Sequence, residues 1–529
     1  MKQINRIVGK DWLLYHPYTV TTQVDNYYIS LCNSVLKIIQ QSEIAEFTDD
    51  LKGKKSLACM LVAYFEDVIS ETRLFSTFTR VHKKMYGKKL PFYDTTKDYY
   101  KDEINVYDIF FLVWYHASIY NKEIFIDPYF ENSSSFNQTI LKIYNLFDRE
   151  FENAPQNNKL QDFLKLPVNS DVKTVREKLT FIAYNSFLWN DFFDHYILEV
   201  IEKYKKEDVV VLDEKAEAFV YDKQIRFIFN KCMPLLSMRT NEYYAEILGE
   251  EHSEYKYIKN ISQQIIGSFL ILKIEKEGYL LEHLTSKKQL WLSNEYTTLQ
   301  NDELKENETV LTISIVQWRD EVWQNQGVCL IATIKEMKGK DVSEHLFEDE
   351  NRKMKIMEHL ENAFLELTNN ERIVYMRGKK EYAKFMINLA RTHTKMVTPN
   401  ITDRELDDAY KNDFKVDMSQ MPFEKDEAMG IFFSSKRGIE VYREGVISCM
   451  PDKNNPFYAH QEFDLCDLIM NRSISVEFIN YIIKNNLIRL CVDGYENPDL
   501  YGIIMENLDF LLRFYQQSNY FSKPQVTIT

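Results

Sequence analysis

Two stretches of basic residues carry side chains that could bind a phosphate-bearing ligand. The first lies between Thr72 and Tyr93 and contains no acidic residue. Aromatic residues alternate with its cations, a combination typical of sites for single-stranded nucleic acid. The alternative is that a helix stops at Gly87 and that the lysines stabilise its carbonyl end. The cations of this stretch are Arg73, Arg80, Lys83, Lys84, Lys88 and Lys89.

The second basic stretch runs from Arg372 to Lys395 and contains Glu381 as its one acidic residue. Lys379 and Lys380 are the candidate contacts within it. If both stretches lined one groove, they would form a positive strip on a chain whose formal net charge is −15. Such a strip would guide a nucleic-acid backbone into one track while the rest of the surface repels it. Single-stranded nucleic-acid binding is therefore one alternative, although nucleic acid is not the favoured partner.

Carboxylates in the N-terminal part of the chain are candidates for acid–base chemistry or for binding a divalent metal. Asp67 and Glu71 are four residues apart and share a helix face. Oxygen-rich clusters suit magnesium or manganese, so a metal-dependent enzyme is the second alternative. The simpler interpretation is structural, with Glu66 forming an ion pair with Arg73. The residues of this hypothesis are Glu66, Asp67, Glu71, Asp102, Glu103 and His116.

Three tryptophans, Trp291, Trp318 and Trp323, fall within a short β-rich segment. Exposed on one sheet face, they would bind a peptide or stack on bases; turned inward, they would be the core of a small barrel. Residues 265–336 contain 7 basic and 11 acidic residues, which disfavours nucleic acid at this segment. A protein-binding or purely structural role remains.

Motifs of the common cofactor and hydrolase sites are absent. No two glycines fall within six residues of each other, so neither a Walker A loop nor a G-x-G-x-x-G turn occurs. The sequence contains no His-Glu-x-x-His and no G-x-S-x-G. The seven cysteines include no Cys-x-x-Cys pair, which is typical of reduced cytoplasmic protein. We assign no catalytic residue, metal or cofactor from the sequence.

Hydrophobic periodicity divides the 529 residues into three domains. A helical pattern with candidate caps at Asp25, Asp171 and Thr240 predicts an N-terminal helical domain over residues 1–252. A C-terminal helical domain over 341–529 contains a β-hairpin near 430–450. Its predicted helices are Glu344–Leu367, Lys379–His393 and Asn497–Gln516.

Between these domains, residues 253–340 predict a small antiparallel, barrel-like β module, with a turn at Asn325–Gly327. The fold class is therefore mainly α with an inserted β module, that is, α+β and multidomain. The predicted strands are Phe269–Glu275, Tyr279–Leu284, Leu290–Leu292, Val310–Trp318 and Val328–Ile334.

Four segments resemble an uncharacterised bacterial family of conserved hypothetical proteins. They are Asp11–Tyr18, Tyr64–Ser70, His82–Gly87 and Cys449–Tyr458. The resemblance implies a bacterial intracellular protein. It transfers no activity and no site residue, because the family has none assigned.

The leading interpretation is a cytoplasmic protein that binds another macromolecule, most favourably a protein. Three observations motivate it: the catalytic motifs above are absent, aromatic residues make up 14% of the chain, and neither a signal peptide nor a membrane span is indicated. Exposed aromatic side chains are the usual anchors of protein interfaces. The oligomeric state is left open.

Overall fold

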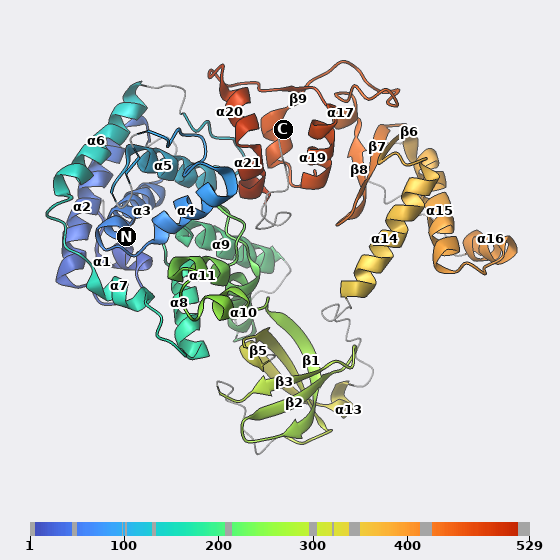
Figure 1. Cartoon of the computed structure of the whole chain (residues 1–529), viewed down its shortest axis with the longest axis horizontal. Coiled ribbons are helices and arrows are strands. Elements are labelled where there is room, and N and C mark those ends of the chain that lie inside the picture. The colour runs from blue at the N-terminus through green and yellow to red at the C-terminus, as the bar shows by residue number, and fades with distance from the viewer. Residues whose placement is uncertain are drawn as a thin grey trace. The chain divides into compact units, whose positions relative to one another are not determined.

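The computed structural model describes residues 6–44, 50–97, 99–100, 103–129, 134–206, 214–295, 304–319, 322–337, 350–412 and 426–516. The chain divides into two compact units. The first unit contains the N-terminal helices and the β module, and the second contains the C-terminal helices with small sheets (Figure 1).

Two apolar helices form the centre of the N-terminal helical domain. In α3 (Leu51–Ile69) every residue from Leu57 to Asp67 is buried, and α5 (Val106–Tyr120) is buried on nearly all sides. Helices that are apolar all round must lie inside a bundle, whereas amphipathic ones cover it. The surrounding elements are α1 (Gly9–Trp12), η1 (Leu13–Tyr15), α2 (Gln23–Gln40), α4 (Leu74–Tyr86), α6 (Ser134–Glu150), α7 (Asn158–Leu164), α8 (Val172–Tyr184), α9 (Asn190–Lys206), α10 (Glu214–Asn230), α11 (Thr240–Leu248) and α12 (Tyr255–Lys259).

Helix starts follow capping chemistry, with two corrections to the sequence prediction. Thr240 is the first residue of α11, and the N-cap of that helix is Arg239. Asp171 is the N-cap of α8, as predicted, and accepts a hydrogen bond from the Thr174 amide at 2.6 Å. Asp25, in contrast, is not the residue before α2. Thr22 is that N-cap, and Asp25 lies in the first turn, where it completes a capping box. The pattern of an acidic residue before an apolar run fits either position.

The β module consists of five strands in the order β1-β2-β3-β5-β4, and β4 returns to pair with β1, so that the pairings form a closed ring. The prediction of a purely antiparallel module is wrong, because β3 and β5 run parallel over two residue pairs. The fifth strand begins at Val322, so the predicted turn at Asn325–Gly327 is wrong: these residues belong to the strand, where β5 has extra residues at a register shift in its pairing with β4. The strands are β1 (Ile265–Ile274), β2 (Gly278–His283), β3 (Gln289–Ser293), β4 (Thr309–Gln317) and β5 (Val322–Thr333), followed by α13 (Ile334–Met337).

The β module is joined to the helices by hydrogen bonds from α10. Asn230 Nδ2 donates to the Gln264 carbonyl at 3.0 Å, and Asn230 Oδ1 accepts from the Gln264 amide at 2.7 Å. Ser314 of β4 donates to Asp222 at 3.2 Å. These bonds satisfy polar groups at the helix–sheet junction and fix the module on the N-terminal helices.

In the second unit a three-stranded sheet, β6-β7-β8, packs against α14 and α15. The predicted hairpin is confirmed as β7 and β8, but β6 was not predicted. The predicted helix Asn497–Gln516 is divided at Asn507, whose Nδ2 donates to the Ile503 carbonyl. The prediction for 344–349 lies outside the described residues. The elements are α14 (Glu350–Leu367), β6 (Ile373–Arg377), α15 (Gly378–Val397), α16 (Asp403–Asn412), β7 (Ala428–Ser434), β8 (Gly438–Arg443), α17 (Glu444–Ile447), β9 (Phe463–Asp464), α18 (Leu465–Met470), α19 (Val476–Lys484), β10 (Leu490–Cys491), α20 (Leu500–Glu506) and α21 (Leu508–Tyr515).

Within the described ranges, no helix combines the length and the apolar character that crossing a lipid bilayer requires.

Candidate functional site

A cleft of about 620 Å³ opens in the N-terminal helical domain. Residues of α3, α4 and α5 line it, together with the segment that leads into α5 and the end of α11. Its volume falls in the range of about 300–1,000 Å³ that is usual for small-molecule pockets. Residues from both the basic and the acidic sets of the sequence analysis meet here. We refer to it as the α4 cleft.

The wall formed by α4 is basic. Arg80 and Lys83 of α4 line the cleft, since residues three positions apart lie on similar sides of a helix, and Arg73, the residue before the helix, lines it as well. Arg80 Nη1 lies 3.2 Å from Glu246 Oε2 and is thereby neutralised. Arg73 and Lys83 are exposed and form no ion pair with any described residue. Lys89 Nζ lies 4.1 Å from the centre of the Tyr99 ring. The cleft therefore offers cations with hydrogen-bonding capacity to a ligand.

The floor of the α4 cleft contains a buried carboxyl group, Asp108, which is 2% exposed. The hydroxyls of Tyr64 and Tyr99 donate to its two oxygens at 2.6 Å and 2.8 Å. Burial raises the pKa of Asp108 to about 7, even though these hydrogen bonds favour the ionised form. A carboxyl group with such a pKa exchanges protons near neutral pH, and a perturbed pKa inside a cleft is typical of functional sites.

A second buried carboxyl group in the cleft, Asp67, has a structural task. The residue before α4, Arg73, has a left-handed backbone with φ of 66° and provides no side-chain cap. Asp67 provides the cap from α3 by accepting hydrogen bonds from the amides of Leu74 and Phe75, both at 2.8 Å, and from the Thr72 hydroxyl. Burial raises the pKa of Asp67 to about 6. Its oxygens hold the start of α4, and its pKa is lower than that of Asp108.

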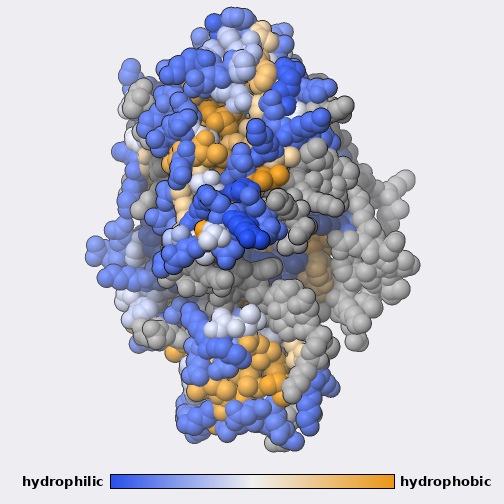
Figure 2. Space-filling model, turned by 90° about the vertical axis from the view of Figure 1, so that its right-hand side faces the viewer, coloured by the Kyte–Doolittle hydropathy of each residue, from blue (hydrophilic) through white to orange (hydrophobic). Residues whose placement is uncertain are grey.

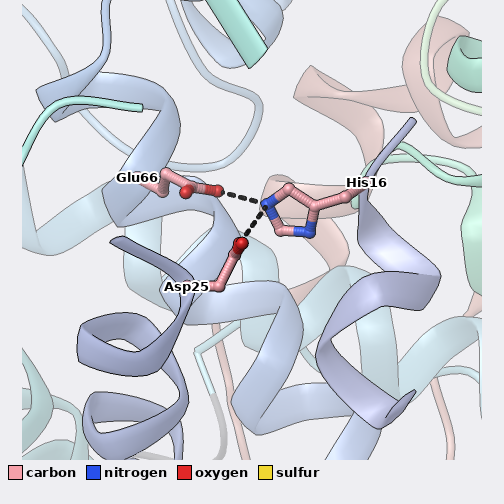
Figure 3. Close-up of side chains that lie close together, drawn as sticks. All are labelled: His16, Asp25 and Glu66. Carbon is pink, nitrogen blue, oxygen red and sulfur yellow. Dashed lines mark hydrogen bonds and ion pairs between the residues drawn. The ribbon is translucent and has the colours of Figure 1, made fainter. Parts of the chain in front are cut away.

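On the other side of α3, three buried side chains from separate elements converge (Figure 3). His16 follows η1, Asp25 lies in the first turn of α2, and Glu66 lies in the last turn of α3. His16 Nε2 is 2.9 Å from Glu66 Oε2 and 4.0 Å from Asp25 Oδ1. The three side chains are 0–1% exposed. We refer to them as the His16 triad.

Hydrogen bonds hold each member of the triad in place. His16 Nδ1 lies 3.1 Å from the Trp12 carbonyl, which directs Nε2 towards the carboxylates. Asp25 Oδ2 accepts from the amide and hydroxyl of Thr22 at 2.6 Å and 2.8 Å. Burial by itself lowers the pKa of His16, but the charges of Glu66 and Asp25 outweigh it and raise this pKa above its ordinary value.

The predicted acidic cluster does not assemble as one site. Glu66 hydrogen-bonds to His16 and is buried, whereas Arg73 is exposed, so the expected ion pair between Glu66 and Arg73 is not formed. Glu71 and Glu103 are exposed, although both line the α4 cleft. Asp102 lies outside the described residues. His116 is fully buried elsewhere, with Nε2 3.6 Å from Asp191.

The first basic stretch lies on α4 and the turn after it, and four of its five aromatic rings are buried, with Tyr86 half-buried. Phe75, Phe78, Phe92 and Tyr93 are buried. Lys84 pairs with Glu250 at 3.1 Å, and Gly87 ends the helix in a left-handed conformation, as predicted. Lys88 is half-buried.

The second basic stretch belongs to the other unit, so a groove shared by both remains a prediction. Its arginines are largely paired within that unit: Arg372 with Glu361 and Glu477, and Arg391 with Asp407. Lys395 Nζ lies 2.8 Å from Asp403. Lys379 is half-buried and Lys380 is exposed, both in the first turn of α15.

The tryptophans of the β module do not form an exposed surface. Trp323 is buried with 8% exposure, and Trp291 and Trp318 are half-buried. The guanidinium of Arg319 lies 5.6 Å from the Trp318 ring. These positions favour the structural role for the aromatic rings of this module.

Sequence reasoning missed His16, Asp25, Tyr64, Tyr99 and Asp108 as site residues. No local spacing marks them, because tertiary packing brings them together across 44 residues for Tyr64 and Asp108 and 50 for His16 and Glu66. A buried carboxyl group early in a wholly apolar helix, as in α5, is the one signal that could have indicated Asp108.

A family model described as "Protein of unknown function (DUF3843)" matches residues 6–270, half of the chain. The chain belongs to this family. The matched region contains both the α4 cleft and the His16 triad, and three of the four segments on which the resemblance rested. No curated protein matches the chain. No solved structure matches it.

Proposed function

We propose that the N-terminal helical domain binds a small anionic ligand in the α4 cleft, with Asp108 as a group that accepts or donates a proton. One observation carries the proposal: the same cleft joins exposed cations, Arg73 and Lys83, to a buried carboxyl group that titrates near pH 7. The cations attract a phosphate or carboxylate group. The polar body of the ligand then lies towards Asp108 and its two tyrosines.

The charges around the cleft explain why the ligand should be small. A polyanion would meet the acidic Glu71 and Glu103 at the rim and a chain of net charge −15. A compact anion contacts the α4 cations without approaching those carboxylates. Binding therefore depends on a few cations inside the cleft rather than on a long positive track.

Adjacent lysines of α4 provide a matched test. Lys83 lines the cleft, whereas Lys84 points to Glu250 and does not. A thermal-shift screen with inorganic phosphate, pyrophosphate, nucleotides and polycarboxylates identifies a stabilising compound. We expect Lys83→Glu to weaken its binding by about tenfold or more, since one lost charge-assisted contact is worth about 1.5–3 kcal/mol. Lys84→Glu should leave the affinity unchanged. Equal effects of both variants, or no stabilising compound, would contradict the proposal.

A second candidate function is protein binding through the β module. Figure 2 shows apolar residues gathered on one face of this module, at the bottom of the view. Leu330 and Ile331 of β5 are 61% and 46% exposed. Successive strand residues point to opposite faces, so these two side chains belong to different surfaces, and this candidate function rests on the surface that includes Leu330. Capture of a partner from lysate by the wild type, and its loss in Leu330→Asp but not in Thr333→Asp, tests this function.

We also propose a cytoplasmic location. None of the seven cysteines forms a disulfide bond, and four of them are buried. Reduced cysteine packed in the core fits a reducing compartment. Fractionation of cells that express the tagged chain tests the location.

A further inference from the structure

The His16 triad provides a set of metal-ligand atoms that the α4 cleft does not use. One imidazole nitrogen and two carboxylate oxygens lie within 4.8 Å of one another. We infer that the triad binds a divalent first-row transition-metal ion, such as zinc or manganese, through His16 Nε2, Asp25 Oδ1 and Glu66 Oε2. This inference does not depend on the anion site.

The separations of the ligand atoms suit an ion. Bonds of about 2.0–2.2 Å to nitrogen and oxygen allow two ligand atoms to be at most about 4.2 Å apart across one ion. The distances from His16 Nε2 to Glu66 Oε2 and to Asp25 Oδ1, 2.9 Å and 4.0 Å, meet this limit. The third pair, which lies within 4.8 Å, needs at most about 0.6 Å of movement to meet this limit, which carboxylate side chains supply by rotation.

The hydrogen bonds around the triad resemble the outer contacts of known metal sites. A ligating histidine usually gives its other ring N–H to a carbonyl, and His16 Nδ1 faces the Trp12 carbonyl at 3.1 Å. The oxygens turned away from the centre are held by Thr22 on Asp25 and by Asn157 on Glu66. The other three atoms face each other: His16 Nε2, Glu66 Oε2 and Asp25 Oδ1, the last of which also accepts from Trp12 Nε1 and Tyr18 Oη. Imidazole with carboxylate favours zinc, manganese or iron over calcium.

Charge balance supports the same conclusion. Without an ion, two carboxylates lie close together in a site that is 0–1% exposed. A buried excess charge is costly. A divalent ion with a neutral imidazole brings the sum to zero. His16 and Tyr18 also line an open depression of about 750 Å³, although the triad side chains themselves are 0–1% exposed.

The competing account is a metal-free ion pair between His16 and the two carboxylates, and the observed contacts are also compatible with it. Asp25 Oδ1 already accepts hydrogen bonds from Trp12 Nε1 and Tyr18 Oη, each at 3.0 Å. In that account every polar atom of the triad has a hydrogen-bond partner in the protein: donors face the carboxylate oxygens, and acceptors face the two ring nitrogens of His16. The two accounts differ in one measurable property, the response of the protein to added metal.

Glu66→Gln separates the two accounts because it keeps the fold. The amide oxygen of the new side chain still accepts from Asn157, and its NH₂ group donates to a neutral His16. The charge that a metal needs is lost. Glu254→Gln is the control, because Glu254 is also buried but pairs with Arg319 outside the triad.

The full chain is stripped with a chelator and titrated with Zn²⁺, Mn²⁺, Co²⁺ and Mg²⁺. Bound metal is measured by inductively coupled plasma mass spectrometry, and the melting temperature is measured by calorimetry. We expect one transition-metal ion per chain and a higher melting temperature for the wild type and Glu254→Gln. Glu66→Gln should bind at least about 100-fold more weakly. Absence of bound metal in the wild type, or equal binding by Glu66→Gln, overturns the inference and establishes the ion pair.

Discussion

Glu66 and Asp67 are consecutive in α3, yet their carboxyl groups serve different parts of the domain. Glu66 hydrogen-bonds to His16 at 2.9 Å, and Asp67 accepts the amides of Leu74 and Phe75 at the start of α4. Successive helical residues differ by about 100° in direction, so neighbours in sequence face different elements. One turn of α3 thus connects the His16 triad to the wall of the α4 cleft.

Asp67→Ala should destabilise the N-terminal domain by about 3 kcal/mol. The substitution leaves two amides and the Thr72 hydroxyl without their acceptor in a site that is 4% exposed. Urea unfolding measures the loss. Glu71→Gln, an exposed change one turn later, should alter the free energy of unfolding by less than about 0.5 kcal/mol. A similar small effect for Asp67→Ala would show that α4 does not depend on this cap.

Gly278→Ala should loosen the β module. A Cβ atom at this position would lie 2.2 Å from the Leu292 carbonyl oxygen, which is backbone and cannot rotate away. We expect a loss of roughly 3 kcal/mol and faster hydrogen exchange in β2 and β3. Gly502→Ala in α20 meets no atom within 4 Å and should be neutral or stabilising by up to about 1 kcal/mol. Unchanged exchange in Gly278→Ala would contradict the close approach.

The elements of the fold were largely predictable because their signals are local. Gly87 marks the end of α4, and Asp171 the start of α8, by capping chemistry that needs only neighbouring residues. The hairpin β7–β8 follows from two apolar runs around a turn. The parallel pairing of β3 with β5 has no such signal, because it depends on how the sheet closes.

The candidate sites were predictable only in part. The α4 cations were identified by type and spacing, but their role depends on partners: Arg80 pairs with Glu246, 166 residues away in sequence. Asp108 was not identified, since its character comes from burial and from the hydroxyls of Tyr64 and Tyr99. Tertiary packing decides which distant residues converge, so their convergence cannot be predicted from composition.

Asp108 should make stability fall as pH rises through the neutral range. Its pKa is about 7 in the folded protein and 3.8 in the unfolded chain, so between these values the folded state holds more protons. Stability from this group is therefore complete below pH 3.8 and is lost as the pH rises to 7, on the order of 4 kcal/mol. Asp108→Asn removes this dependence. Urea unfolding of both proteins from pH 4 to 8 measures it, and parallel curves would contradict the raised pKa.

The contribution of His116 to stability should change with pH in the opposite direction to that of Asp108. Neither ring nitrogen has a hydrogen-bond partner among the described residues, and burial lowers its pKa to about 3 from 6.5. The unfolded chain then binds the extra proton between pH 3 and 6.5. Stability from the neutral ring is present above pH 6.5 and is lost as the pH falls, on the order of 5 kcal/mol in all.

His116→Phe tests this, because phenylalanine keeps the ring that stacks on Tyr120 at 4.4 Å between ring centres. Near pH 7 the variant should match the wild type to within about 2 kcal/mol. Between pH 7 and pH 4, the free energy of unfolding of the wild type should fall relative to that of the variant. The reason is that the variant has no imidazole to protonate on unfolding. A wild type that loses no stability relative to His116→Phe between pH 7 and 4 would show that His116 is charged or solvated in the folded protein. Comparison with Asp108→Asn over the same range separates the two groups, because their contributions to stability change with opposite sign.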